Sequence, residues 1–130
     1  MASIFTKIIN GDIPSHKVAE NEHCIAFMDI NPVAKGHLLV VPKEETDYFF
    51  DLEDETLGQL MTFAKPIAKA IEKVIDCERI GVTILGLEVP HAHVHLVPLD
   101  KKGMISFANK VAMSHEELAA LAEEIAANIQ

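Results

Sequence analysis

The sequence predicts an α+β domain with a mainly antiparallel sheet and two helices, in the order strand, strand, helix, strand, strand, helix. Two observations predict this fold class. Short apolar runs bounded by turn residues occur as a pair in each half of the chain, and a segment with helical periodicity follows each pair. A length of 130 residues with 49% hydrophobic residues suits one globular domain, which we expect to span residues 1–130.

The first pair of predicted strands covers residues 23–30 and 37–41. Asn31 and Pro32 stop the first strand, and Pro42 closes the second. Because only a short loop separates the two strands, we expect them to pair in antiparallel fashion.

Two further segments complete the first half of the chain. Residues 4–9 are apolar and compatible with either a strand or a helical turn, and residues 10–14 are rich in turn formers. Helical periodicity then begins at Asp51. Pro66 lies inside this pattern and should either kink the helix or mark the end of an earlier short helix. The apolar positions spaced three and four residues apart are Leu57, Leu60, Met61, Ala64, Ile67, Ala68, Ile71, Val74 and Ile75.

The second half of the chain repeats the arrangement, with predicted strands at residues 79–85 and 91–99. Ser114, followed three residues later by Glu117, predicts a capping box at the start of a C-terminal helix. The apolar face of that helix consists of Leu118, Leu121, Ala122, Ile125 and Ile129.

Charge and cysteine content exclude several classes of protein. The 11 basic and 20 acidic residues give a net charge of −9, which argues against binding a nucleic-acid backbone. Residues 44–55, which contain seven acidic residues and no basic one, are interpreted as a solvated surface. Cys24 and Cys77 lie too far apart to indicate a Cys-x-x-Cys metal site or a disulfide framework. The apolar runs are shorter than the ~20 residues of a membrane span, and the N-terminus lacks a signal-peptide pattern, so we expect a cytoplasmic protein.

Three alternating histidines are the most informative feature of the chain. His91, His93 and His95 fall in one predicted strand, where alternate side chains share a face and lie about 6.5–7 Å apart. The three imidazoles are therefore expected on one face of the sheet, while the apolar residues between them point into the opposite core.

Two kinds of chemistry use imidazoles at this spacing. A His-x-His pair on a strand can hold zinc when a third ligand and oriented second-shell partners are present. Alternatively, one neutral imidazole attacks an electrophile such as phosphorus, because its neighbours disfavour protonation. The neighbours then donate hydrogen bonds to phosphoryl oxygens or protonate a leaving group. The residues alone leave both possibilities open.

Residues 91–97, His-Ala-His-Val-His-Leu-Val, resemble the signature of the histidine triad family, His-φ-His-φ-His-φ-φ, in which φ is apolar. Residues 4–14 are similar to the N-terminal segment of the family, and residues 26–32 and 36–43 are similar to its central hairpin. These matches follow the order of the family over almost the whole chain. As a whole, the sequence resembles the nucleotide-binding hydrolase branch of this family, whose members are typically homodimers.

The resemblance implies a role for each histidine of the cluster. His93 would be the nucleophile that takes the nucleoside monophosphoryl group, and His95 and His91 would contact the phosphate and the leaving group. His37 would complete the cluster, and Asp29 would accept hydrogen bonds from the ribose hydroxyls. An apolar slot for the base would be formed by Ile4, Phe5, Ile8, Phe27 and Ile30. Leu39 and Glu88 would be two further nucleotide-binding residues.

The sequence departs from the family pattern in two places. Many members carry an Asn-x-Gly segment and a Gly-Gln pair before the triad, whereas this shortened loop has no Asn and carries Leu87 in place of Gln. Glu88 matches an acidic residue of some bacterial members. Ser3 and Thr6 stand where some members have a Cys-x-x-Cys that contributes to structural zinc, so no structural zinc is predicted.

The resemblance therefore implies an enzyme that acts on the α-phosphate of purine nucleoside phosphoramidates or related nucleotides, through a covalent nucleotidyl-histidine and without metal or cofactor. The expected partners are a purine nucleotide and a second copy of the chain, with neither nucleic acid nor membrane. One alternative is a purine nucleotide-binding module in which the altered loop has removed efficient catalysis. Another is a metalloenzyme that uses the triplet as ligands.

Overall fold

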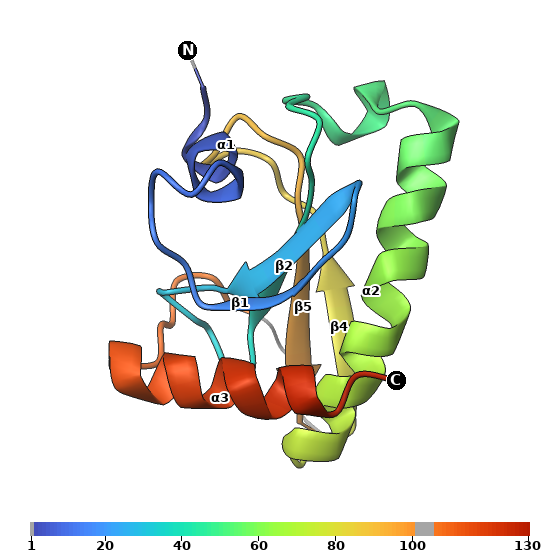
Figure 1. The fold of residues 1–130 in the computed structure, drawn as a ribbon. Coiled ribbons are helices and arrows are strands. Elements are labelled where there is room, and N and C mark those ends of the chain that lie inside the picture. Colours follow the sequence, from blue (N-terminus) through green and yellow to red (C-terminus); the bar gives the residue numbers. More distant parts are fainter. Residues whose placement is uncertain (1, 101–105) are drawn as a thin grey trace.

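The computed structural model describes residues 2–100 and 106–130, which form an antiparallel five-stranded sheet with helices on both faces (Figure 1). The α+β fold predicted from the sequence is confirmed. The strand order is β1-β2-β3-β5-β4, and every neighbouring pair is antiparallel. The strands are β1 (Lys17–Glu20), β2 (Cys24–Met28), β3 (Leu38–Pro42), β4 (Arg79–Thr83) and β5 (Val94–Leu99). The helices are α1 (Ile4–Ile9), α2 (Asp54–Val74) and α3 (His115–Ala127), with a 3₁₀ turn, η1, at Phe49–Asp51.

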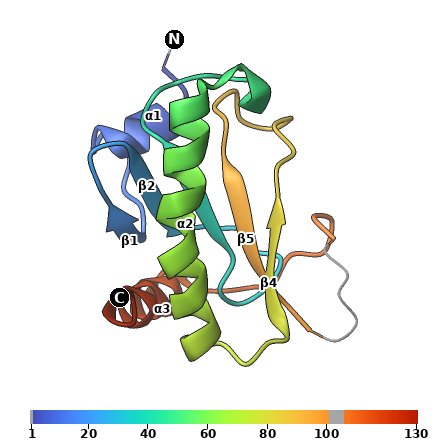
Figure 2. The same ribbon diagram turned by 90° about the vertical axis from the view of Figure 1, so that its right-hand side faces the viewer.

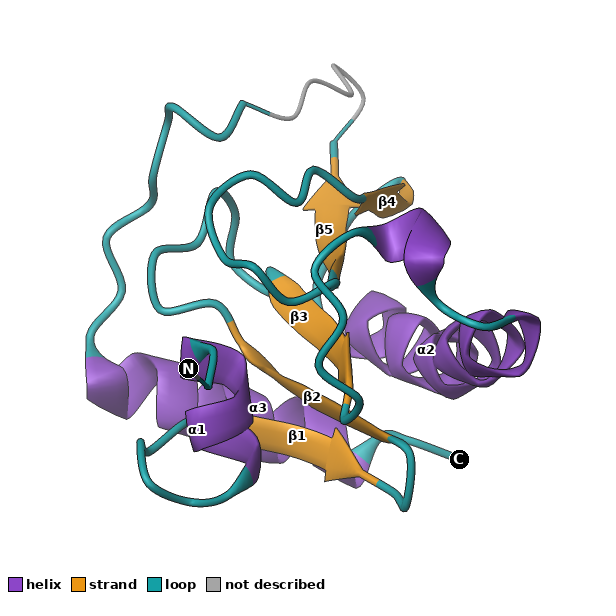
Figure 3. Ribbon diagram, turned by 90° about the horizontal axis from the view of Figure 1, so that it is seen from above, coloured by secondary structure: helices purple, strands orange, loops and turns teal. Residues whose placement is uncertain are grey.

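Two helices of very different length cover one face of the sheet. The helices α2 and α3 contact each other and lie on the same side of the sheet (Figure 2). Their apolar residues form one buried core with alternate residues of β2, β3 and β5. The strands twist, so the edge strands β1 and β4 point in clearly different directions (Figure 3). Because both faces of β2 and β3 are covered, all residues of these two strands are buried.

The opposite face carries a smaller core, which the short helix α1 closes. Phe5 of α1 packs with Phe27 of β2 and Leu39 of β3, and Ile25 and Val41 complete this cluster. The side chains of successive strand residues alternate between the two cores, as the period of a strand requires.

In the first half, the structure decides between two predicted alternatives at one point and differs from the predictions at two others. Residues 4–9, predicted as either a strand or a helical turn, form a helix, and Ser3 caps it by accepting a hydrogen bond from the backbone N–H of Thr6. The edge strand β1 was not predicted, because only Val18 of its four residues is buried and no apolar alternation marks it. The long helix begins at Asp54 rather than Asp51, after the 3₁₀ turn.

Helix α2 runs through Pro66 without ending there, so of the two predicted alternatives an earlier helix that ends at this proline is excluded. A proline removes one hydrogen bond, to the carbonyl four residues earlier. That carbonyl belongs to Thr62, which is exposed, and water can replace the lost donor there.

In the second half, both predicted strands form and they pair in antiparallel fashion. Strand β4 ends at Thr83 rather than at residue 85, and β5 begins at Val94 rather than at residue 91. The capping box at Ser114 and Glu117 is confirmed, since each side chain bonds the backbone N–H of the other residue. Among the described residues, no helix is long and apolar enough to span a membrane.

Candidate active site

The histidine triad lies where the chain enters β5, which is paired on both sides, with β3 and β4. His95 is in β5, opposite Leu39 of β3 and Thr83 of β4, whereas His91 and His93 lie in the extended segment just before the strand. This segment leaves the ladder because the backbone N–H of Ala92 donates to the carbonyl of Thr46 at 2.7 Å. The predicted alternation nevertheless holds, with Ala92, Val94 and Leu96 all buried in the core beneath α2 and α3.

His91 is fully buried, and the protein occupies both of its ring nitrogens. Its Nε2 lies 2.8 Å from the carbonyl oxygen of Pro42, so Nε2 carries the proton and donates. Its Nδ1 lies 2.8 Å from the hydroxyl of Ser3, which donates to it when the ring is neutral. This arrangement leaves His91 no free nitrogen for a phosphate or leaving group.

His93 has one bound nitrogen and one that no protein group occupies in the described residues. Its Nδ1 lies 2.7 Å from the carbonyl oxygen of His91, which can only accept, so the proton sits on Nδ1. In the neutral ring, the lone pair is therefore on Nε2, as a nucleophile requires. The edge of Phe5 packs against the ring at a centroid distance of 4.9 Å and helps to fix its orientation.

His37 and His95 form a hydrogen-bonded chain with a defined direction. The backbone N–H of Val33 donates to Nδ1 of His37 at 3.1 Å, so the proton of a neutral His37 is on Nε2. That Nε2 lies 2.9 Å from Nδ1 of His95 and donates to it. His95 consequently carries its proton on Nε2, where it can donate to a bound phosphate.

The surroundings keep these rings neutral. Burial lowers the pKa of His93, and burial together with His93 and His37 lowers the pKa of His95 to about 4. Burial also lowers the pKa of His37, although the Asp29 carboxylate, 3.5 Å away, acts in the opposite direction. Near pH 7 the site thus combines an unprotonated nucleophile with a neutral donor.

A cavity of about 240 Å³ opens in front of His93 and His95. All eight sequence-predicted nucleotide-binding residues lie in its wall, whereas His91 and His37 are not part of the wall. The wall comprises Ile4, Phe5, Ile8, Ile13, Pro14, Ser15, Phe27, Met28, Asp29, Ile30, Asn31, Leu39, Glu88, Val89, His93 and His95. Six of these residues were not predicted as binding residues, namely Ile13, Pro14, Ser15, Met28, Asn31 and Val89.

Asp29 lies at the rim of this cavity, directly after β2. One carboxylate oxygen accepts the backbone N–H of Asn31 at 2.8 Å, in a local turn that fixes the side chain. A carboxylate has further acceptor capacity, which suits a pair of hydroxyl groups.

A metal fits the cluster poorly. The donor atoms of Asp29, His37 and His95 lie within 4.8 Å of one another, but His37 and His95 spend the relevant nitrogens on their mutual hydrogen bond. The Ser3 and Thr6 hydroxyls are likewise poor substitutes for the thiolate ligands that zinc prefers. They are bonded instead to Glu45 and His91.

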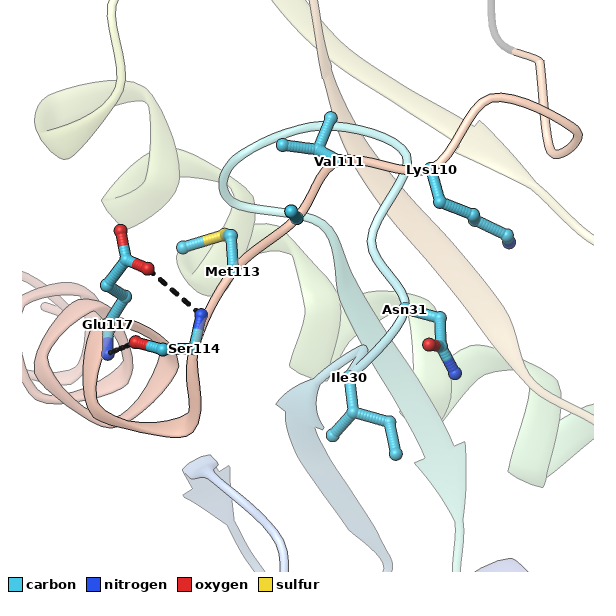
Figure 4. A pocket seen from close by; sticks show the side chains of 8 residues that line it. Ile30, Asn31, Lys110, Val111, Met113, Ser114 and Glu117 are labelled. Atoms are coloured by element: carbon cyan, nitrogen blue, oxygen red, sulfur yellow. Dashed lines mark hydrogen bonds between the residues drawn. The ribbon is translucent and has the colours of Figure 1, made fainter.

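Two further cavities adjoin the site. One of about 560 Å³ shares Ile30 and Asn31 with the first cavity and includes Lys110 on the segment before α3 (Figure 4). The other, of about 310 Å³, shares His93 and is lined by aromatic and apolar side chains, namely Tyr48, Phe49, Phe50, Ile84, Leu85 and Leu87. Phe107, near Lys110, packs on His95 at a centroid distance of 4.8 Å.

A family model, the HIT domain, matches residues 10–102 of the chain. The chain belongs to the HIT family. It is 36% identical to the adenosine 5'-monophosphoramidase of Schizosaccharomyces pombe, with 100% of both chains covered. It is also 36% identical to the adenosine 5'-monophosphoramidase of Saccharomyces cerevisiae, covering 99% of this chain and 84% of the yeast protein. Among solved structures, a Hit-like protein of Bartonella henselae superimposes with a TM-score of 0.88 at 34% identity, covering 97% of this HIT protein and 95% of the other chain.

Proposed function

We propose that this HIT protein is a nucleoside phosphoramidase that uses His93 as a covalent nucleophile. The observation that carries the proposal is the pair of ring nitrogens at the cavity, an unprotonated Nε2 on His93 beside a protonated Nε2 on His95. The two similar phosphoramidases, each matched over 99% or more of this chain, support a nucleotide hydrolase activity of the HIT type.

The proposed reaction has two displacement steps at the α-phosphate. In the first step a bond forms between Nε2 of His93 and phosphorus, the bond from phosphorus to the leaving nitrogen breaks, and the amine departs with a proton from water. In the second step water attacks phosphorus and gives a proton to the hydroxide left by the first step, the bond from phosphorus to Nε2 breaks, and the nucleoside monophosphate and free His93 result. Nε2–H of His95 donates to a phosphoryl oxygen in both transition states.

The cavity wall supports a purine nucleoside as the group that is held. Phe5, Phe27 and Ile8 provide flat and branched apolar surface for a base, and Asp29 provides acceptors for the ribose hydroxyls. In this proposal His91 positions its neighbours rather than contacting the phosphate, because both of its nitrogens are occupied.

The test is hydrolysis of adenosine 5'-phosphoramidate by metal-free protein. His93→Ala should reduce turnover on the order of 10³-fold or more, because it removes the nucleophile. The matched control is His115→Ala, since His115 is an exposed histidine that bonds His16 and is not part of the cavity wall. Near-normal turnover by His93→Ala would exclude covalent catalysis at this residue.

A binding module with little catalysis is the second candidate, and the altered loop before the triad favours it. In this loop Leu87 is 92% exposed where many members carry a Gln, so its side chain offers a phosphate no hydrogen bond. Binding of adenosine monophosphate without turnover of the phosphoramidate would establish this candidate instead.

We also propose that the chain forms one HIT domain over residues 1–130 and assembles as a homodimer. Strand β4 is at an edge of the sheet, and Val82, Ile84 and Leu85 along and beyond it are 50%, 38% and 55% exposed. An exposed apolar edge strand of this kind is a ready surface for pairing with a second chain.

A further inference from the structure

Glu45 belongs to the acidic stretch that the sequence analysis interpreted as solvated surface, but its carboxylate has specific partners. One oxygen, Oε1, accepts the backbone N–H of Ser3 at 2.7 Å and the hydroxyl of Thr6 at 2.6 Å. These hydrogen bonds lower the pKa of Glu45 to about 2. The side chain therefore connects the segment after β3 to the start of α1, across 42 residues of sequence.

We infer that Glu45, acting through Ser3 and Thr6, is a positioning residue that holds His91 and thereby the nucleophile His93. The expected effect on kcat and KM rests on the proposed function. The expected effect on the tautomer and orientation of His91 rests on the hydrogen bonds alone.

The protons of this network can be placed one by one. Thr6 donates its hydroxyl proton to Glu45. The oxygen of Ser3 accepts the backbone N–H of Thr6 at 3.0 Å. Its own proton has two acceptors within reach, Nδ1 of a neutral His91 at 2.8 Å and the Thr6 hydroxyl oxygen at 3.3 Å, and the nearer one is His91. Nε2 of His91 donates to Pro42, which leaves one tautomer of this ring consistent with all four bonds.

The backbone of His91 connects this hydrogen-bond network to the proposed nucleophile, His93. Its side chain is held at both ends, by α1 and by β3, and its carbonyl oxygen accepts Nδ1–H of His93 at 2.7 Å. Second-shell contacts of this kind fix the tautomer and orientation of a functional imidazole. A small displacement of a reacting group costs rate steeply.

The same network holds one wall of the cavity. Helix α1 has only six residues, too few to be stable by itself, yet it supplies Ile4, Phe5 and Ile8 to the cavity. Loss of the Glu45 contacts should therefore loosen this wall and raise KM, while the disturbed His91 lowers kcat.

The kinetic test compares Glu45→Ala with Glu45→Gln. We expect Glu45→Ala to lower kcat/KM for adenosine 5'-phosphoramidate on the order of 10-fold, with changes in both kcat and KM. Glu45→Gln keeps an oxygen acceptor and should restore most of the activity. Thr6→Val and Thr6→Ser form a second pair, in which only serine keeps the hydroxyl that donates to Glu45.

The matched control is Glu44→Ala, because Glu44 is the adjacent acidic residue, is exposed, and lies 3.5 Å from Thr56 rather than at α1. This variant should keep kcat/KM. Assays run well below the unfolding temperature of each variant separate positioning from a general loss of stability.

A spectroscopic readout is independent of turnover. In protein labelled with ¹⁵N-histidine, the ring nitrogens of His91 should report a single tautomer with the proton on Nε2, and Glu45→Ala should shift them towards an averaged state. Unchanged His91 signals together with unchanged kcat/KM in Glu45→Ala would overturn the inference. If the wild type fails to hydrolyse the phosphoramidate, the proposed function fails, while the His91 signals and the affinity for adenosine monophosphate still decide the role of Glu45.

Discussion

The buried imidazoles of this HIT protein differ in what their hydrogen-bond partners permit. A backbone N–H imposes an unprotonated Nδ1 on His37, and a backbone carbonyl imposes a protonated Nδ1 on His93. His37 donates to Nδ1 of His95, so the proton of His95 is on Nε2. At the cavity, Nε2 of His93 therefore carries a lone pair, whereas Nε2 of His95 carries a proton. Backbone groups thus assign the roles of the side chains.

The depressed pKa of His95 predicts a dependence of stability on pH. In the unfolded chain this imidazole has the ordinary value of 6.5, whereas in the folded protein its pKa is about 4. Between these values the unfolded state binds more protons, so the free energy of unfolding should fall as pH is lowered from about 6.5 towards 4. The loss from this residue should be on the order of 3 kcal/mol at most.

Urea unfolding at several pH values between 7 and 4.5 measures this effect. His95→Gln removes the titrating ring, so its stability should change less steeply over the same range than that of the wild type. The comparison of slopes cancels the contribution of carboxylates common to both proteins. Equal slopes would show that His95 titrates alike in the folded and unfolded states.

The turn that leads into β3 contains a glycine, Gly36, whose conformation and close packing require the absence of a side chain. Gly36 has φ of +98°, and an added Cβ would lie 3.0 Å from both Ile75 Cγ1 and Pro98 Cγ. Gly36→Ala should therefore destabilise the protein by about 1–3 kcal/mol and disturb the adjacent His37. Gly11→Ala is the control, because Gly11 also has a positive φ of +82° but no heavy atom within 4 Å of the added Cβ.

Denaturant midpoints of the two variants separate steric conflict from backbone strain. Gly11→Ala should show the cost of the positive φ alone, and Gly36→Ala a larger one. A Gly36→Ala protein as stable as Gly11→Ala would contradict the tight packing at this turn.

Gly58 lies in the exposed part of α2 and has open space for a Cβ. Gly58→Ala should therefore stabilise the protein by about 1 kcal/mol.

Elements with a local signal could be predicted from the sequence, and elements fixed by distant partners could not. The capping box at Ser114 and the hairpin of β2 and β3 rest on neighbouring residues, and both formed as predicted. Strand β1 has only Val18 buried, and it takes its conformation from pairing with β2.

The candidate site shows the same division. The alternation of His91, His93 and His95 was visible in the chain, and the resemblance pointed to the residues of the cavity. The occupation of both nitrogens of His91 was not visible, because its hydroxyl partner Ser3 is 88 residues away. Glu45 was hidden for the opposite reason, since an acidic residue among others has the pattern of ordinary surface.

At the scale of the whole molecule, the fold gathers the site from the N-terminus, the central hairpin and β5. Helix α1 covers one end of the sheet, Asp29 and His37 flank the loop between β2 and β3, and the C-terminal segment is tied to that loop by Val111 N–H donating to Pro32 at 2.7 Å. The apolar side chains along the β4 edge are exposed, which leaves this edge available to a second copy of the chain.

The proposed homodimer predicts that a charge at the β4 edge produces monomers. Val82 is 50% exposed in β4, so a lysine there faces solvent in the monomer but would bury a charge in an interface. Val111→Lys provides the control, because Val111 is a comparable valine, 41% exposed, on the C-terminal segment. Sedimentation equilibrium should give the mass of a dimer for the wild type and for Val111→Lys, and the mass of a monomer for Val82→Lys. A monomeric wild type would exclude the homodimer, and a dimeric Val82→Lys would move the interface away from β4.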